Sequence, residues 1–168
     1  MDNAIINFAV YENGNEFLGM ADVTLPDLTF LTQTVSGAGL GGTVEAVMPL
    51  IDAMTMTLNF RTMNKSDIDL ASPKLRVLDL RAAQQETDNV TGEIKDVSVK
   101  HAISCKTKTF KGGKLAPAST GDVSVEMAVD SWTCYVGGKK TIDVCPRTMT
   151  CYINGVDFLK GPRKALGK

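Results

Sequence analysis

Alternating apolar and polar residues dominate the last third of the chain, residues 123–159. From 123 to 130 every second residue is apolar, which is typical of a strand with one buried face. The pairs Gly137-Gly138 and Asn154-Gly155 interrupt this pattern, and such pairs suit tight hairpin turns. We expect this part of the chain to be an antiparallel meander that serves as scaffold.

The same period predicts strands over 5–11, 17–25, 28–35, 75–83 and 94–105. The clearest strand spans residues 53–63. Its predicted core face holds Met54, Met56, Leu58 and Phe60, and its opposite face holds Thr55, Thr57 and Asn59. The helix expected over 65–71 has Ser66 as a candidate N-cap, and residues 106–120 are expected to form an exposed loop.

The least ordinary stretch spans Ser36 to Met54 and is rich in glycine. A phosphate-binding loop is excluded, because such a loop should open a helix and a proline follows too soon. We expect a long, partly extended excursion whose glycines allow close approach to another backbone. Its length exceeds what a hairpin needs, so we predict that it packs on a neighbouring subunit through Gly37, Gly39, Gly41, Gly42 and Pro49.

Charge is distributed unevenly along the chain of 168 residues, whose size fits one domain over 1–168. The formal net charge is −1, yet the first 60 residues contain seven acids and no Lys or Arg. Such asymmetry predicts surfaces with separate partners. The start of the chain lacks the pattern of a signal peptide, and no segment matches a membrane helix, so a cytosolic protein is expected.

Residues suited to catalysis are few. His101 is the one histidine, and its position between Val99 and Ile103 on an apolar strand face favours a structural role. The four cysteines lack close pairs, which favours buried free thiols over a zinc site. We therefore predict no catalytic residue, no metal site and no cofactor.

The C-terminal segment from Cys151 resembles the end of the FII-type major tail tube proteins of contractile phage tails and R-type bacteriocins. The resemblance rests on Ile153-Asn154-Gly155-Val156-Asp157, followed by Leu166-Gly167. Further similarity lies in Thr24-Leu25-Pro26, in Gly41-Gly42 before a long hairpin loop, and in Lys139-Lys140 and Pro146 of the penultimate hairpin. Length and element order agree from end to end.

This resemblance implies a mainly β fold of two packed antiparallel sheets, sandwich-like or barrel-like, with one short flanking helix and a long hairpin loop. It also implies a structural protein whose hexameric rings stack helically into the inner tube of a contractile tail. The implied partners are other copies, a sheath protein, baseplate and terminator proteins, and DNA that passes without specific binding. Assembly would occur in the bacterial cytoplasm, without membrane insertion, before incorporation into a virion tail or a released particle.

Two surfaces follow from the resemblance and the charges. A conduit for DNA must not bind phosphate, so Glu45, Thr55, Thr57 and Asn59 are expected to line the lumen. Asp67 and Asp69, at the start of the predicted helix, are expected to face the sheath, as is the basic stretch 106–114. The alternatives are a type VI secretion tube protein and a monomeric β-sandwich binding module, although the aromatic residues are scattered.

Overall fold

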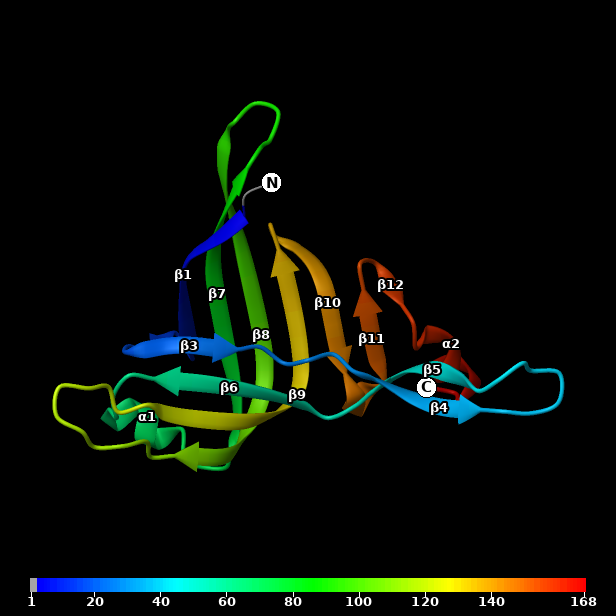
Figure 1. The fold of residues 1–168 in the computed structure, drawn as a ribbon, viewed down its shortest axis with the longest axis horizontal. Helices are drawn as coiled ribbons and strands as arrows, with labels where there is room; N and C mark the ends of the chain where they lie inside the picture. Colours follow the sequence, from blue (N-terminus) through cyan, green and yellow to red (C-terminus); the bar gives the residue numbers. More distant parts are fainter. Residues whose placement is uncertain (1–2) are drawn as a thin grey trace.

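The computed structural model describes residues 3–168 and is built mainly of antiparallel strands (Figure 1). The strands are β1 (Asn3–Glu12), β2 (Asn15–Glu16), β3 (Met20–Thr24), β4 (Phe30–Val35), β5 (Val44–Ile51), β6 (Met54–Phe60), β7 (Leu75–Thr87), β8 (Ile94–Lys111), β9 (Val123–Val136), β10 (Lys139–Cys145), β11 (Thr150–Ile153) and β12 (Val156–Asp157). Helices α1 (Lys65–Asp69) and α2 (Lys160–Ala165) and the 3-10 turn η1 (Pro146–Thr148) are short. The predicted mainly β fold is confirmed.

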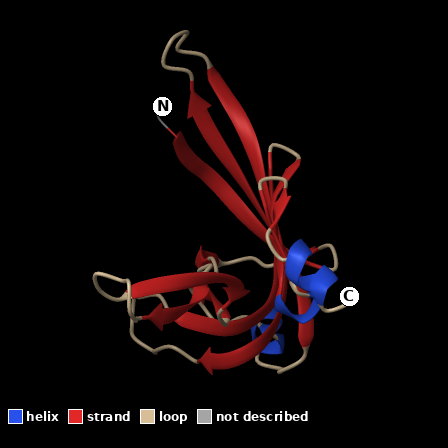
Figure 2. Ribbon diagram, turned by 90° about the vertical axis from the view of Figure 1, so that its right-hand side faces the viewer, coloured by secondary structure: helices blue, strands red, loops and turns tan. Residues whose placement is uncertain are grey.

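Ten strands form one sheet, and the remaining two, β4 and β5, form a second. The long sheet divides at β9, because β6 and β10 pair with different halves of it. β6 pairs with β9 as far as Val129, whereas β10 pairs with it from Trp132 onward, and Asp130 lies between the two. Figure 2 shows that the sheet bends sharply, so that its two parts form layers around one core.

The core is a single cluster to which both layers contribute. From β6 come the four predicted core residues, Met54, Met56, Leu58 and Phe60, each no more than 3% exposed. They belong to the same cluster as Leu78 of β7. Because apolar burial is the main stabilising term in folding, this shared cluster holds the two layers together.

Two buried polar side chains have partners on neighbouring strands. The Arg76 guanidinium on β7 lies 3.0 Å from both carboxylate oxygens of Glu12 on β1. Trp132 Nε1 donates to His101 Nδ1 at 3.1 Å, which confirms the predicted structural role of this histidine. The four cysteines are free, as predicted, and three of them are buried.

Turn chemistry explains where the strands reverse. Gly137 and Gly138 both have positive φ, as does the pair Asn154 and Gly155, so these predicted turns are confirmed. Asn13 precedes the glycine of the first turn and also has positive φ. The chain after this turn does not form the single strand expected over 17–25, because residues 17–19 separate β2 from β3.

Two expectations about the remaining elements were wrong. Residues 106–111 continue β8 instead of starting a loop, because their pairing with β9 extends to Lys111. Helix α1 is capped by Asn64 rather than Ser66 and ends at Asp69. A second helix, α2, follows the last strand; Arg163 anchors it through an ion pair with Asp157.

Candidate assembly surfaces

The β4–β5 hairpin extends away from the rest of the molecule (Figure 1). Its strands pair from Phe30 with Ile51 to Val35 with Val44, and residues 36–43 connect them. The predicted excursion is therefore mostly a regular hairpin. Pro49 lies within β5 at an irregularity of the pairing, and the four glycines lie in the connecting loop.

Phe30 and Ile51 at the base of this hairpin pack against the core, but beyond them both faces are largely exposed, although the hairpin carries many apolar side chains. Those exposed by 38–66% are Leu31, Val35, Leu40, Val44, Val47 and Leu50. Within the described residues β5 touches β11, but no strand pairs with either edge of the hairpin. An isolated two-stranded hairpin is marginally stable in water. This surface therefore suits contact with another chain.

A second surface is the outer side of the layer formed by β3, β6, β9 and part of β8, which we call the β6 face. Residues directly opposite each other in antiparallel strands share one face. By this criterion the β6 face comprises Asp22, Thr24, Thr55, Thr57, Asn59, Lys106, Thr109, Lys111, Ser124, Glu126 and Ala128. Thr55, Thr57 and Asn59 thus lie together, opposite the core, as the alternation of the strand predicts.

The lysines of the β6 face are mostly paired with carboxylates. Lys108, at a bulge of β8, has its Nζ 3.4 Å from Oε1 of Glu126. The Asp130 carboxylate lies 3.6 Å from Lys106 and 3.4 Å from Arg147. Lys106 and Lys108 therefore lie on the same face as Thr57. A lumen contact for Thr57 and a sheath contact for these two lysines cannot both be right.

One other residue expected in the lumen, Glu45, lies apart from the β6 face. Glu45 is not on a strand next to β6, because β5 pairs with β4 and the neighbours of β6 are β3 and β9. Arg61 forms no ion pair within 4.0 Å among residues 3–168. Arg61 instead borders a hollow of about 330 Å³ with Asp22 and Asp122.

Helix α1 presents only one of its two acids to solvent. The Asp67 side chain is 0% exposed and accepts a hydrogen bond from the Asn64 backbone N–H at 3.2 Å. Burial raises the pKa of this carboxyl. Asp67 therefore caps the helix and is not available to a sheath. Asp69 is exposed and lies 3.3 Å from Arg76 and 3.9 Å from Lys74.

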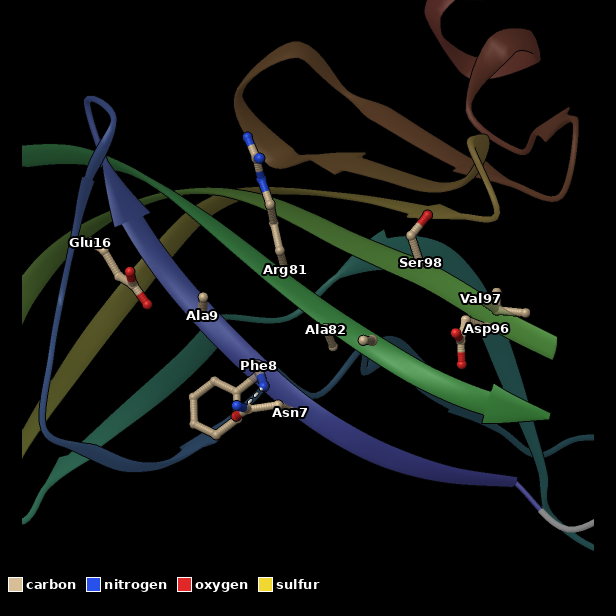
Figure 3. Close-up of a pocket in the computed structure, with 10 residues that line it drawn as sticks. Asn7, Phe8, Ala9, Glu16, Arg81, Ala82, Asp96, Val97 and Ser98 are labelled. Carbon is tan, nitrogen blue, oxygen red and sulfur yellow. Dashed lines mark hydrogen bonds between the residues drawn. The ribbon is translucent and has the colours of Figure 1, made fainter. Parts of the chain in front are cut away.

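Strands β1, β7 and β8 continue upward as an arm beyond the packed layers (Figure 2). A hollow of about 490 Å³ lies along this arm, and its lining includes Phe8, Glu16, Arg81 and Asp96 (Figure 3). The hollow is open, and in the close-up the labelled side chains do not converge on one point. No group of acids, histidines or cysteines among residues 3–168 is arranged to hold a metal ion.

Comparison with known families identifies the chain. A family model described as phage tail tube protein FII matches residues 2–167. The chain belongs to this phage tail tube family. No curated protein matches its sequence. Membership of this family makes the protein a structural component of a phage-type tail. None of its described helices is long and apolar enough to span a membrane.

The fold of this tail tube protein also occurs in solved structures, among them a component of a contractile injection system. It comes from the cryo-EM structure of the sheath/tube terminator of PVC, an extracellular contractile injection system, in the extended state. The TM-score is 0.52 at 9% sequence identity, and the match covers 77% of this chain and 94% of that chain. At this identity the likeness shows the fold alone.

Sequence reasoning overlooked two carboxylates here, namely Glu126 on the β6 face and Asp130, which pairs with Lys106 of that face. The alternation of residues 123–130 predicted a strand and placed Glu126 on its polar face. Its partner Lys108, however, was predicted to lie in a loop. The bulge at 107–109 brings these charges together, and nothing in the alternation of β8 marks it. Only the pairing register reveals this arrangement.

Proposed function

We propose that this chain is the repeating subunit of the inner tube of a contractile tail, with six subunits in each ring and rings stacked helically inside a sheath. The observation that carries the proposal is the uncovered β4–β5 hairpin, whose exposed apolar side chains need a partner surface. A neighbouring subunit and the adjacent ring supply that surface in a stacked tube.

The layer under the β6 face supports the channel. It contains four strands, β3, β6, β9 and β8, so six subunits would contribute about 24 strands. With strands about 4.8 Å apart and tilted by about 40°, the barrel would be roughly 48 Å across at the backbone. Side chains would leave a lumen of roughly 38 Å, which admits a DNA duplex and little more.

We assign the β6 face to the lumen because its chemistry suits a passive conduit. Thr55, Thr57 and Asn59 are uncharged, and the amide of Asn59 donates to Asp22 at 2.5 Å. Lys106 and Lys108 are each within 4 Å of a carboxylate, which limits their attraction for phosphate. In this assignment Asp69 remains the sheath-facing acid of α1, and Glu45 acts at the hairpin contact between subunits.

Electron microscopy of the purified protein tests this function. We expect tubes of stacked six-fold rings from the wild-type chain. Deleting residues 37–42, which removes the glycine loop, should leave a folded subunit that forms no tubes. As a control, Val90→Ser changes an exposed apolar residue at the tip of the arm and should leave tubes intact. Monomers from the wild-type chain would refute the proposal, and single rings that never stack would favour a terminator.

A further inference from the structure

The layer under the β6 face has two ends with different attachments. The β4–β5 hairpin is inserted between Thr24 of β3 and Met54 of β6, which lie at one end of the layer. The loop from β8 to β9 lies at the other end, beside Met20 and Phe60. Figure 1 shows the hairpin and this loop extending in opposite directions. We call residues 25–53 the hairpin end, and residues 17–19, 61–65 and 111–122 the loop end.

Exposed apolar side chains lie at both ends. At the loop end Leu115 is fully exposed, and Leu18 and Met63 are exposed by 68% and 47%. Near the tip of the hairpin, Leu40 and Val44 are exposed by 46% and 54%. Apolar side chains that gather on the surface in this way mark contact sites between proteins.

The loop that carries Leu115 is held closed at its neck. The Lys114 N–H donates to the Gly121 carbonyl at 2.8 Å, and the Gly121 N–H donates to the Arg61 carbonyl at 2.6 Å. Gly113 has a φ of +78°, and a Cβ at this position would clash with the Gly121 oxygen, so only glycine fits. A loop fixed in this way can present Leu115 to a partner at little cost in conformational entropy.

The two ends also carry opposite charge. Residues 25–53 contain no Lys or Arg, and their three acids are all exposed, namely Asp27, Glu45 and Asp52. At the loop end three exposed cations have no carboxylate within 4.0 Å among residues 3–168, namely Arg61, Lys65 and Lys111. A fourth cation there, Lys114, is paired with Asp122 at 3.2 Å. The uneven charge along the sequence thus becomes opposite charge at the two ends of one layer.

Stacking of rings brings these opposite ends together. In the barrel proposed above the strands are tilted by about 40° from the tube axis, so the two ends of the layer face opposite sides of a ring. When rings of the same orientation stack, the hairpin end of one ring meets the loop end of the next. Such a head-to-tail contact joins two different surfaces, so it can repeat along the tube without closing on itself.

We propose that the β4–β5 hairpin of each subunit docks on the loop end of a second copy in the adjacent ring. Leu115 packs against Leu40 and Val44 in this contact, and Glu45 lies beside the three cations. The docking rests on the tube assembly proposed above and names the surface that receives the hairpin. It also gives the tube a direction, because each ring has an acidic side and a basic side.

Leu115→Ser tests the docking without disturbing the core, since this side chain is fully exposed. The variant should keep the far-UV circular dichroism of the wild type and yield several-fold fewer tubes in electron micrographs, because an apolar anchor between rings is lost. The matched control is Val90→Ser, which changes an exposed apolar residue in the loop at the tip of the arm. Equal tube yields from the two variants would overturn the docking and leave Leu115 to a partner outside the tube.

Charge reversal provides a second test. Glu45→Lys alone, or Lys65→Glu with Lys111→Glu, should reduce tube yield several-fold, and the loss should be larger at low salt. Combining all three substitutions restores opposite charge across the contact and should recover most of the yield. Glu93→Lys, on the arm, controls for the change in net charge. No recovery in the triple variant, while both parent variants fold, would overturn the proposal.

Disulfide formation gives a third readout and separates the two proposals. Leu115→Cys combined with Leu40→Cys or Val44→Cys should give covalent ladders of more than six subunits in at least one pairing after oxidation of tubes, because the contact runs along the tube. Single-cysteine variants show the background from the four native thiols. Tubes without ladders above this background overturn only the docking, whereas a wild-type chain that never forms rings overturns the tube function as well.

Discussion

Glu126→Gln is the substitution that most directly tests the β6 face as a neutral lumen. Glu126 lies directly opposite Thr57 on β6, and its carboxylate is 3.4 Å from Nζ of Lys108. The substitution keeps the shape of the side chain but removes its charge. Lys108 then loses its partner, and each ring of six subunits would gain six uncompensated ammonium groups on its inner wall.

The structure sets the expected magnitude. At 3.4 Å in water the ion pair is worth about 1.2 kcal/mol by Coulomb's law, and exposed pairs measure below about 1 kcal/mol. Tube assembly should therefore survive. DNA binding responds more strongly, since each phosphate contacted adds about 0.9 to the salt slope. Two contacts would weaken binding about twelvefold between 50 and 200 mM salt.

The assay is co-sedimentation of a short DNA duplex with assembled tubes over a range of salt concentrations. Wild-type tubes should retain little duplex, and Glu126→Gln tubes should retain more at low salt. Glu93→Gln is the matched control, because it frees Lys95 from a similar pair on the arm. Thr57→Lys is the positive control, since it adds a cation beside Glu126 on the same face.

Equal retention by Glu126→Gln and Glu93→Gln tubes would refute the reasoning, because the two variants have the same net charge. Retention by Thr57→Lys tubes alone would show that this face lines the lumen but that Lys108 does not reach the duplex. Loss of tubes in both β6-face variants would show that the face is buried between subunits.

Three further predictions concern the stability of the subunit, each measured by urea denaturation. Arg76→Met should lower the free energy of unfolding by about 3 kcal/mol, because it leaves the half-buried Glu12 carboxylate without its cation. Adding Glu12→Leu should recover most of this loss, and a loss below about 1 kcal/mol for Arg76→Met would contradict the reasoning. Burial lowers the pKa of His101, so protonation of this side chain favours the unfolded chain. The free energy of unfolding should be at its full value above about pH 6.5 and decline as the pH falls below it. Trp132 fluorescence reports the change, which should be absent in His101→Gln. Asp67→Ala should lower stability by about 1 kcal/mol through loss of the helix cap and leave tube yield unchanged, whereas lost tubes would place α1 at a subunit contact.

The sequence determined the strands and their faces wherever one face is buried. The alternation from Met54 to Phe60 identified both sides of β6, because a strand between core and solvent must alternate with period two. The glycine and asparagine pairs located the turns, since few residues accept positive φ. His101 was recognised as structural from its apolar neighbours alone.

The tertiary structure decided what depends on pairing between distant segments. The lysine-rich segment after Cys105 was predicted to be an exposed loop. Only its pairing register with β9 shows that the segment continues β8 and places lysines on the β6 face. Asp67 looked like a surface acid, because local sequence does not record how deeply a helix end is buried. Glu45 was grouped with Thr57 as a lumen residue, yet it lies on β5, which pairs with β4 alone. Hydrophobic periodicity tells which side of a strand is buried, but the neighbour at each edge is selected by contacts far apart in the chain.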